Sequence, residues 1–228
     1  MKKKKLGKVL FCGRKNCNIS KDIRSFIKKK SNKFYYAECS KIGEKIPSKF
    51  TKVKFDYVFC FRSFFILKKN FLKKVRNVSI NFHPSPPEFR GAGGINYSLF
   101  KKLNFFATTA HVMNEKIDYG DIIDVRKLII NDKDNIEKVL SKTYRLSFVQ
   151  IKYVINELLK NPNNIFNLIK KNKNIKWSKK YNSIKDLNKF YEINLGITKK
   201  IFLRKIRATY TSKFKPYIFL HGKKFILE

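Results

Sequence analysis

Short apolar runs recur through the first half of the chain, each bounded by polar residues, glycine or proline. Runs of this length are typical of strands that are covered on both faces. We therefore expect strands over residues 8–12, 33–37, 56–61, 75–82, 105–113 and 122–130. Apolar residues at helical spacing predict short helices over residues 20–29, with Ser20 as N-cap, and over 68–74 and 95–103.

Strands that alternate with short helices indicate the fold class. We expect an α/β protein with a Rossmann-like, mostly parallel twisted sheet flanked by helices. Residues 135–160 show the most regular amphipathic pattern, which ends at Asn161-Pro162 and is typical of a packing helix. We assign residues 1–162 to one main domain, which should carry the chemistry.

The composition of the chain changes after Pro162. Residues 163–182 are rich in Lys and Asn, and residues 185–193 suggest a short helix. Two apolar runs on either side of His221-Gly222 are typical of a β-hairpin. We therefore expect a small C-terminal subdomain over residues 163–228, built from a helix and a terminal hairpin.

The formal net charge is +37, from 53 Lys and Arg against 16 Asp and Glu. Such a surplus can mark a surface for nucleic acid or another polyanion. Here it accompanies many Asn, Ile and Phe residues and is spread along the whole chain, which favours a codon-level bias toward A and T instead. With either explanation, a field this positive would attract an anionic substrate.

The absence of targeting signals in the sequence and the pattern of its cysteines indicate the cellular location of the protein and the state of its thiols. No segment reaches the roughly 18 consecutive apolar residues of a membrane span, and the basic start is followed by too short an apolar run for a secretory signal. The four cysteines form no C-x-x-C pair and have no His at zinc-ligand spacing, so we expect buried free thiols and no metal. The sequence predicts a cytoplasmic protein that does not engage a membrane.

The stretch 79–94 combines a strand end with a loop rich in proline and glycine. Asn81 and His83 are two apart on the expected strand, so they point to the same side at its carboxyl end, where open α/β sheets place ligands. The loop contains three prolines and three glycines, so one half is stiff and the other lets a ligand approach the backbone. Asp118, 35 residues after His83, is a third polar candidate. A turn cap, a satisfied loop histidine and ordinary turn chemistry would explain the three one by one.

Two nucleotide-binding motifs are absent from the sequence. Gly13 stands alone after the first strand, so no G-x-G-x-x-G supports a nicotinamide or flavin dinucleotide site. The glycines within 91–94 are not followed by Gly-Lys-Ser/Thr, so they do not form a Walker loop. The three polar candidates therefore need a different explanation.

Four motifs follow one another along the chain. They are Asn81-Phe82-His83-Pro84, Arg90-Gly91 at the end of the Pro-rich loop, Thr109-Ala110-His111, and Asp118-Tyr119-Gly120-Asp121-Ile122-Ile123. In these motifs and in the order of elements, residues 8–160 resemble the folate-dependent formyltransferases. That family carries N-x-H-P, a Pro-rich loop ending in R-G, a T-x-x-H-like strand and D-x-G-x-I-I, and N-x-H-P with a downstream D-x-G is its specific signal.

The resemblance implies that Asn81, His83 and Asp118 are catalytic. Asn81 would hold the formyl oxygen and donate a hydrogen bond to the oxyanion formed when an amine attacks the formyl carbon. His83 would act as general base on the amine or stabilise the oxyanion further. Asp118 would orient and charge-stabilise His83 and could relay a proton to the departing folate nitrogen. This chemistry needs no metal.

The resemblance also implies the formyl donor, 10-formyltetrahydrofolate. Its pterin would lie against the backbone that follows the Cys60 strand and near the loop preceding Asp118. The residues expected to bind it are Phe61, Arg62, Ser63, Phe64, Ile66 and Gly120.

The acceptor is harder to predict, because the family formylates several amines. Phosphoribosylglycinamide enzymes usually show a Gly-rich phosphate loop after the first strand, of which Cys12-Gly13-Arg14-Lys15 is a poor version. Methionyl-tRNA enzymes add a C-terminal β-barrel of about domain size, whereas about 60 residues follow Pro162 here. Deformylases, which use water, normally carry an N-terminal regulatory domain that this sequence lacks.

The remaining branch formylates amino sugars carried on a nucleotide, and segments 84–91, 96–99 and 205–209 resemble it. We therefore expect a nucleotide-linked amino sugar as the substrate, within surface-glycan (lipopolysaccharide O-antigen) biosynthesis. The residues expected to contact it are Arg90, Gly93, Asn96 and Tyr97. Helix capping or core packing explains Asn96 and Tyr97 equally well, and Arg90 could instead anchor its loop. Related sugar enzymes often pair through their C-terminal parts, so a homodimer is also expected.

A second hypothesis belongs to a different class of protein. A non-catalytic, basic nucleic-acid-binding module with an inherited enzyme fold would account for the charge. The complete set of Asn81, His83 and Asp118 and the lack of an aromatic-basic RNA-recognition motif argue against it. Methionyl-tRNA and phosphoribosylglycinamide formyltransferases stay open as alternatives within the family, whereas a nucleic-acid partner is not the expected one.

Overall fold

The computed structural model describes residues 4–228, and the chain divides into two compact units. Unit 1 comprises the residues up to Pro84, Thr108–Arg126 and Tyr144–Lys176. Unit 2 comprises Ser85–Ala107, Lys127–Thr143 and Trp177–Glu228. Each unit therefore combines segments that are far apart in the sequence. The domain boundary expected at residue 162 stays a prediction.

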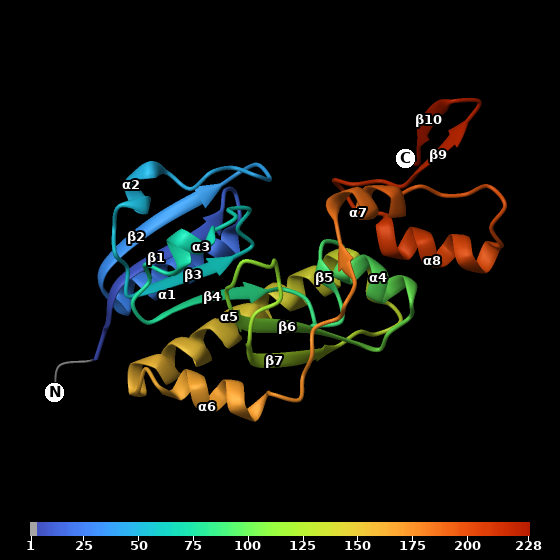
Figure 1. The fold of residues 1–228 in the computed structure, drawn as a ribbon. Coiled ribbons are helices and arrows are strands. Elements are labelled where there is room, and N and C mark those ends of the chain that lie inside the picture. Colours follow the sequence, from blue (N-terminus) through green and yellow to red (C-terminus); the bar gives the residue numbers. More distant parts are fainter. Residues whose placement is uncertain (1–3) are drawn as a thin grey trace. The chain divides into compact units, whose positions relative to one another are not determined.

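A six-stranded sheet forms the centre of the α/β fold, which confirms the expected fold class. Its strands lie in the order β2-β1-β3-β4-β6-β7. The first four of these are parallel, and β6 is antiparallel to β4. The strands are β1 Leu6–Arg14, β2 Ser31–Cys39, β3 Tyr57–Phe61, β4 Val78–His83, β6 Phe105–Val112 and β7 Ile122–Ile129 (Figure 1).

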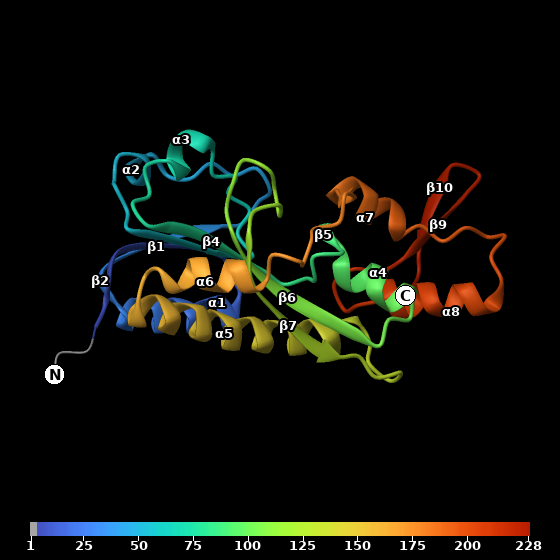
Figure 2. The same cartoon turned by 60° about the horizontal axis from the view of Figure 1, so that its bottom comes forward.

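Two apolar clusters cover the two faces of the strands in unit 1. The first joins β1, β3 and β4 to helices α1, α5 and α6, and Phe11, Phe59 and Phe82 are fully buried in it. The second joins β1, β2 and β3 to α2 and α3 and contains Cys12 and Cys60. Figure 2 shows α1, α5 and α6 along one side of the sheet. The helices are α1 Asn18–Lys29, α2 Ser48–Thr51, α3 Lys69–Leu72, α5 Ile136–Lys160 and α6 Asn164–Lys171.

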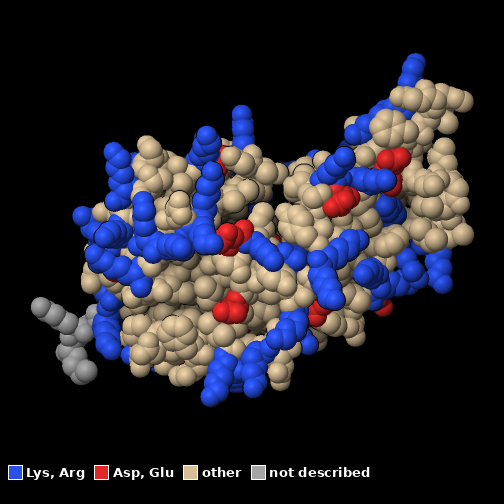
Figure 3. Space-filling view, in the orientation of Figure 1, with Lys and Arg blue, Asp and Glu red and all other residues tan. Residues whose placement is uncertain are grey.

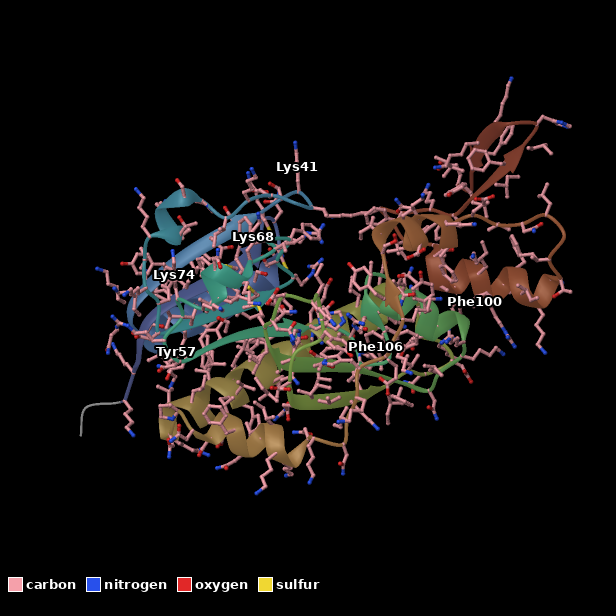
Figure 4. All side chains as sticks on the ribbon, viewed as in Figure 1. Lys41, Tyr57, Lys68, Lys74, Phe100 and Phe106 are labelled. Carbon is pink, nitrogen blue, oxygen red and sulfur yellow. The ribbon has the colours of Figure 1, made fainter. Side chains whose placement is uncertain are left out.

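Unit 2 has an apolar core of its own, in which Phe89, Leu99, Phe106 and Ala208 are buried together. Phe106, and Phe100 packed against this core, are labelled in Figure 4. Its helix α4 lies against α8. The elements of this part of the chain are β5 Arg90–Gly91, α4 Gly94–Phe100, β8 Tyr181–Asn182, α7 Ile184–Phe190, α8 Lys199–Thr209, β9 Tyr217–Leu220 and β10 Lys223–Ile226.

The expected strands, the long helix and the terminal hairpin β9–β10 are confirmed. The N-cap assigned to Ser20 was wrong, because α1 begins at Asn18 with Cys17 as N-cap and Ser20 is buried inside it. Helices α6 and α8 were not expected. In α6 the apolar spacing of Ile165 and Leu168 was hidden by the surrounding Lys and Asn residues.

Basic side chains are distributed over the visible face of both units and do not gather in one patch (Figure 3). Lys41, Lys68 and Lys74, labelled in Figure 4, are exposed. This agrees with the even spread of lysine along the sequence. None of the helices in the described part of the chain combines the length and the apolar character needed to cross a bilayer.

The first cluster of unit 1 predicts a matched pair of stability effects. Phe59 is 0% exposed, whereas Phe166 on α6 is 68% exposed. Phe59→Ala leaves a cavity and should lower the free energy of unfolding by about 3–5 kcal/mol. Phe166→Ala should change it by less than about 0.5 kcal/mol. Urea denaturation measures both, and equal losses would contradict a packed core around Phe59.

Candidate active site

Asn81 and His83 lie at the carboxyl end of β4, as the sequence predicts. Strand β6 runs antiparallel beside them and pairs Asn81 with His111 and His83 with Thr109. Directly opposed residues on neighbouring strands project to the same face of a sheet. The register of β4 and β6 therefore brings a second histidine, His111, to the two expected residues.

Asp118 lies in the loop between β6 and β7 and meets all three of these side chains. Asn81 Nδ2 donates to Asp118 Oδ1 at 3.1 Å, His83 Nδ1 lies 3.4 Å from Asp118 Oδ2, and His111 Nε2 lies 3.6 Å from Oδ1. The Asp118 side chain is only 8% exposed. A carboxylate this deeply buried needs donors around it to offset its lost hydration. We call Asn81, His83, His111 and Asp118 the polar cluster.

The hydrogen bonds of His111 fix the orientation of the Asn81 amide. His111 Nδ1 lies 2.9 Å from the carbonyl oxygen of Val112, which can only accept, so Nδ1 carries the proton. In the neutral ring, Nε2 is then an acceptor, and Asn81 Nδ2 lies 3.1 Å from it. Asn81 thus directs its NH2 group at both His111 and Asp118. The sequence motif Thr109-Ala110-His111 contains this residue, although no role for it could be inferred from the sequence alone.

The loop that carries Asp118 is shaped by its own backbone. Asp118 has a φ of 47°, a left-handed conformation that Asp tolerates better than most residues. The backbone N–H of Val112 donates to Asp121 O at 2.9 Å, which closes the loop. Gly120 lies so close to the Val112 carbonyl that a Cβ there would collide with it. The D-x-G spacing therefore reflects the close packing of this loop on the end of β6.

Helix α5 anchors the end of β4 through buried polar groups. Thr108 Oγ1 donates to the carbonyl oxygen of His83 at 3.2 Å and lies 3.0 Å from Ser147 Oγ. Gln150 Nε2 donates to Thr108 O at 3.2 Å and to Asp124 Oδ2 at 2.9 Å. The side chains of Thr108, Ser147 and Gln150 are fully buried. α5 thus does more than pack, because it fixes the strand end that carries His83.

The residues expected at the folate donor follow β3 and the Asp118 turn in unit 1. Phe61 is fully buried in the first cluster, so only its backbone can face a ligand. Ser63 Oγ accepts from the backbone N–H of Phe65 at 3.2 Å, and Ile66 is 60% exposed. Arg62 and Phe64 contact other side chains of unit 1. Binding of the donor by these residues and by Gly120 stays a prediction.

The residues expected at the acceptor lie in unit 2 and take part in its packing. Arg90 Nη1 donates to the carbonyl of Ser178 at 3.3 Å. Gly93, with a φ of 78°, is the N-cap of α4. Asn96 Nδ2 donates to Ala208 O at 2.7 Å, and the Tyr97 ring lies edge-on to Phe190 at 4.9 Å. These contacts fit the anchoring and packing alternatives, and a role in substrate binding stays a prediction.

All four cysteines are buried free thiols, as expected. A hydrogen bond with Cys60 and burial raise the pKa of Cys12 well above its ordinary value. Within residues 4–228, no three His, Cys, Asp or Glu side chains are grouped as metal ligands.

Comparison with known proteins identifies the class. The model of the formyl transferase family, described as "Formyl transferase", matches residues 10–151. A methionyl-tRNA formyltransferase from Ehrlichia ruminantium (strain Welgevonden) is 33% identical over 160 residues, which are 70% of this chain and 48% of that protein. The chain belongs to the formyl transferase family, which confirms the resemblance read from its motifs. It spans about half the length of the curated relatives it matches.

Solved structures share the fold over nearly the whole chain. A 4-N formyltransferase from Francisella tularensis has a TM-score of 0.75 at 22% identity, over 96% of each chain. An N-formyltransferase from Helicobacter canadensis, solved with folinic acid and dTDP-3-aminofucose, has a TM-score of 0.67 at 18% identity, over 95% of this chain and 85% of that one. At these identities the likeness establishes the fold alone.

The close packing at Gly120 predicts a stability effect that depends on position. In Gly120→Ala the new Cβ meets the Val112 carbonyl, so the free energy of unfolding should fall by about 1–3 kcal/mol. In Gly196→Ala the nearest atom, Asn194 Oδ1, is 3.6 Å from the added Cβ, so that variant should stay within about 1 kcal/mol of the parent. Thermal denaturation compares the two. If Gly120→Ala left the free energy of unfolding unchanged, Gly120 would not be closely packed against the Val112 carbonyl of β6.

Proposed function

We propose that this protein transfers the formyl group of 10-formyltetrahydrofolate to the amine of a nucleotide-linked amino sugar. The observation that carries the proposal is the polar cluster, in which an amide, two imidazoles and a buried carboxylate meet at the end of β4. Formyl transfer to an amine needs a donor for a developing oxyanion and a base for the amine proton. The cluster contains a group suited to each task.

Asn81 is suited to stabilise the oxyanion. Its NH2 group already points at two acceptors, His111 Nε2 and Asp118 Oδ1. When the amine attacks the formyl carbon, the new oxyanion would compete with these acceptors for one amide hydrogen. His111 would keep the amide in the required orientation, because its own Nδ1 is bound to the Val112 carbonyl. Holding the donor group in place beforehand lowers the cost of reorganisation during the reaction.

His83 and Asp118 are suited to take the proton of the amine. His83 Nδ1 faces Asp118 Oδ2 at 3.4 Å, so Nε2 is the ring nitrogen that would receive the proton. The imidazolium that forms would be stabilised by the carboxylate beside it. The proton could then pass on to the departing folate nitrogen. The proton lost by the amine is thus gained by the leaving group, and the reaction consumes no external acid or base.

The donor would supply an activated formyl group and a nitrogen that leaves as an amine. The turn after β3 is suited to hold its pterin, since it presents the backbone of residues 61–66 at the same sheet edge as the polar cluster. The packing of Gly120 against Val112 leaves no side chain on the loop at that point. Both features support a flat ligand lying against main chain.

The acceptor class is supported by likeness of fold and by charge. Solved structures of similar fold include the Helicobacter canadensis protein, whose structure contains a dTDP-linked aminofucose. A net charge of +37 would attract a substrate with a diphosphate. A place in surface-glycan assembly, a cytoplasmic location and pairing of two copies stay predictions from the resemblance.

Methionyl-tRNA is the second candidate acceptor, because the curated relatives matched by sequence carry that name. The match covers about half of those proteins. The panel experiment below therefore includes charged initiator tRNA as a competing acceptor.

An acceptor panel tests the proposal directly. The protein is incubated with 10-formyltetrahydrofolate and nucleotide-linked 3-amino and 4-amino sugars, and in parallel with charged initiator tRNA. We expect a formylated sugar nucleotide, detected as a mass increase of one formyl group, and no formylated tRNA. Product from tRNA alone would replace the sugar by the second candidate, and no product from any acceptor would overturn the proposal.

Variants of the polar cluster test the roles assigned to its members. Loss of the oxyanion donor in Asn81→Ala should lower kcat about 10²–10³-fold. Loss of the base in His83→Ala should lower kcat about 10²–10⁴-fold. His221→Ala is a matched control, because His221 is exposed in the turn between β9 and β10. Unchanged kcat in both cluster variants would remove these residues from the mechanism. Absence of turnover in the parent protein, together with steeply salt-dependent RNA binding, would instead favour the non-catalytic hypothesis.

A further inference from the structure

Buried polar side chains connect helix α5 to three strands of the sheet in unit 1. Gln150, which is 0% exposed, lies at the centre of this set. Its Nε2 donates to the carbonyl oxygen of Thr108 on β6 at 3.2 Å, and to the carbonyl oxygen and Oδ2 of Asp124 on β7 at 2.9 Å each. These are the two strands between which the Asp118 loop lies. One side chain of α5 therefore bonds to both strands from which that loop arises.

The orientation of the Gln150 amide is fixed by its partners. Carbonyl and carboxylate oxygens only accept, so the NH2 group faces them and Oε1 faces Thr108. Thr108 Oγ1 lies 3.0 Å from Gln150 Oε1 and 3.2 Å from the carbonyl oxygen of His83, and its single proton serves these two acceptors. Ser147 Oγ, at 3.0 Å, is then a donor to Thr108. The hydrogen bonds thus run without a break from α5 to the His83 backbone.

An ion pair holds the other end of this set. Arg126 Nε donates to Asp124 Oδ2 at 2.9 Å, and the guanidinium lies over the Tyr153 ring at 4.5 Å from its centroid. Both members of the pair are half-buried. Gln150 therefore donates to a carboxylate that is itself fixed, and a hydrogen bond to a charged acceptor is stronger than one to a neutral acceptor. This contact resists rotation of the amide.

The His83 backbone is the point at which β4 leaves the sheet. His83 is the last residue of β4, and Pro84, which follows it, has no N–H to continue the strand pairing. The bond from Thr108 Oγ1 fixes the carbonyl at this position. His83 Nδ1 lies 3.4 Å from Asp118 Oδ2, beyond the usual length of a hydrogen bond to a carboxylate. A small displacement of either residue therefore decides how strongly the two groups interact.

Stability alone does not account for these buried polar groups. The neighbouring buried positions of α5 are apolar, as at Ile151, Val154 and Ile155. Replacing a buried hydrogen-bonded set by apolar groups of the same shape is often neutral or even stabilising. Geometry is what the polar set provides, because hydrogen bonds fix direction and distance whereas apolar contacts are not directional.

We propose that Gln150 is a positioning residue that sets the separation of His83 from Asp118. The inference rests on the proposed function, in which these two residues take the proton of the amine. Gln150 acts through Thr108 on the end of β4 and through Asp124 on the strand that follows the Asp118 loop. Movement of one strand end relative to the other would break at least one of these buried hydrogen bonds, which is costly.

Steady-state kinetics with 10-formyltetrahydrofolate and the amino sugar identified by the acceptor panel test the proposal. Gln150→Met and Thr108→Val keep the shape of the core but lose the hydrogen bonds, and each should lower kcat at least about tenfold, since small misplacements of a catalytic group are costly. The KM for the donor should stay within about twofold, because neither residue is expected to contact the donor. Unchanged kcat in both variants would overturn the proposal.

Two further variants separate positioning from a general loss of stability. Thr108→Ser keeps the hydroxyl and should retain kcat within about twofold of the parent. Ser31→Ala is the matched control, because Ser31 is also buried and its Oγ donates to the Ile27 carbonyl at 2.8 Å, away from the polar cluster. It should leave kcat unchanged. Equal losses in Thr108→Ser and Thr108→Val, or in Ser31→Ala and Gln150→Met, would contradict a role in positioning.

Nuclear magnetic resonance of the histidine rings tests the same inference without turnover. The chain has three histidines, and the exposed His221 serves as an internal reference. His83 Nδ1 faces a carboxylate, so the ring ¹⁵N shifts of the parent should show the proton on Nδ1. In Gln150→Met they should move toward an average of both tautomers, whereas those of His221 stay constant. Unchanged His83 shifts would overturn the proposal. A tautomer change in a protein that formylates no sugar would support the positioning role and refute only the proposed function.

Discussion

The buried carboxylate of Asp118 is the constraint on which the centre of unit 1 depends. Removing a carboxylate from water costs several kcal/mol unless donors and positive groups surround it. From β4, the Asn81 amide donates to this carboxylate and His83 faces it with Nδ1, while His111 on β6 keeps the Asn81 amide in the required orientation. Their arrangement requires the β6–β7 loop to fold back closely on β6, which is why Gly120 lies against the Val112 carbonyl. Local backbone strain and the placement of the polar side chains thus have one physical origin.

The antiparallel direction of β6 makes this arrangement possible. In a purely parallel sheet, the carboxyl end of β4 would lie beside the carboxyl end of its neighbour, and only loop residues would surround it. Here β6 runs the other way and places His111, near its own end, opposite Asn81. The same strand carries Thr108, which ties the His83 carbonyl to α5. One change in strand direction therefore supplies both a member of the cluster and its support.

The site depends partly on local strand geometry and partly on the pairing of β4 with β6, and only the first of these could be predicted from the sequence. Alternation along a strand was enough to place Asn81 and His83 on one side, because that is a local property of β structure. His111 was overlooked, since its closeness to Asn81 depends on the register between β4 and β6, which tertiary packing determines. Helix α8 was missed for another reason, because its buried residues, such as Ala208, are few among lysines and arginines. Helix α1 has Cys17 as its N-cap, although Ser20 has the higher preference for that position. The turn after β1 determines where the helix begins, and it outweighs the preference of a single residue.

Positive and negative side chains lie at different strand ends along the carboxyl edge of the sheet, so the electrostatic potential changes along this edge. The net charge of the chain alone would not produce such a change. The guanidinium groups of Arg14 and Arg62, which form no ion pair within residues 4–228, lie at the ends of β1 and β3, and the Asp118 carboxylate lies beside the end of β4. An amino sugar on a diphosphate carries a positive amine at one end and negative phosphates at the other. Such a molecule would be attracted by the general positive field, and the Asp118 carboxylate would favour the approach of its amine to His83. The scattered lysines would then influence how fast the substrate arrives, whereas these few buried and half-buried charges would determine how it is positioned for reaction.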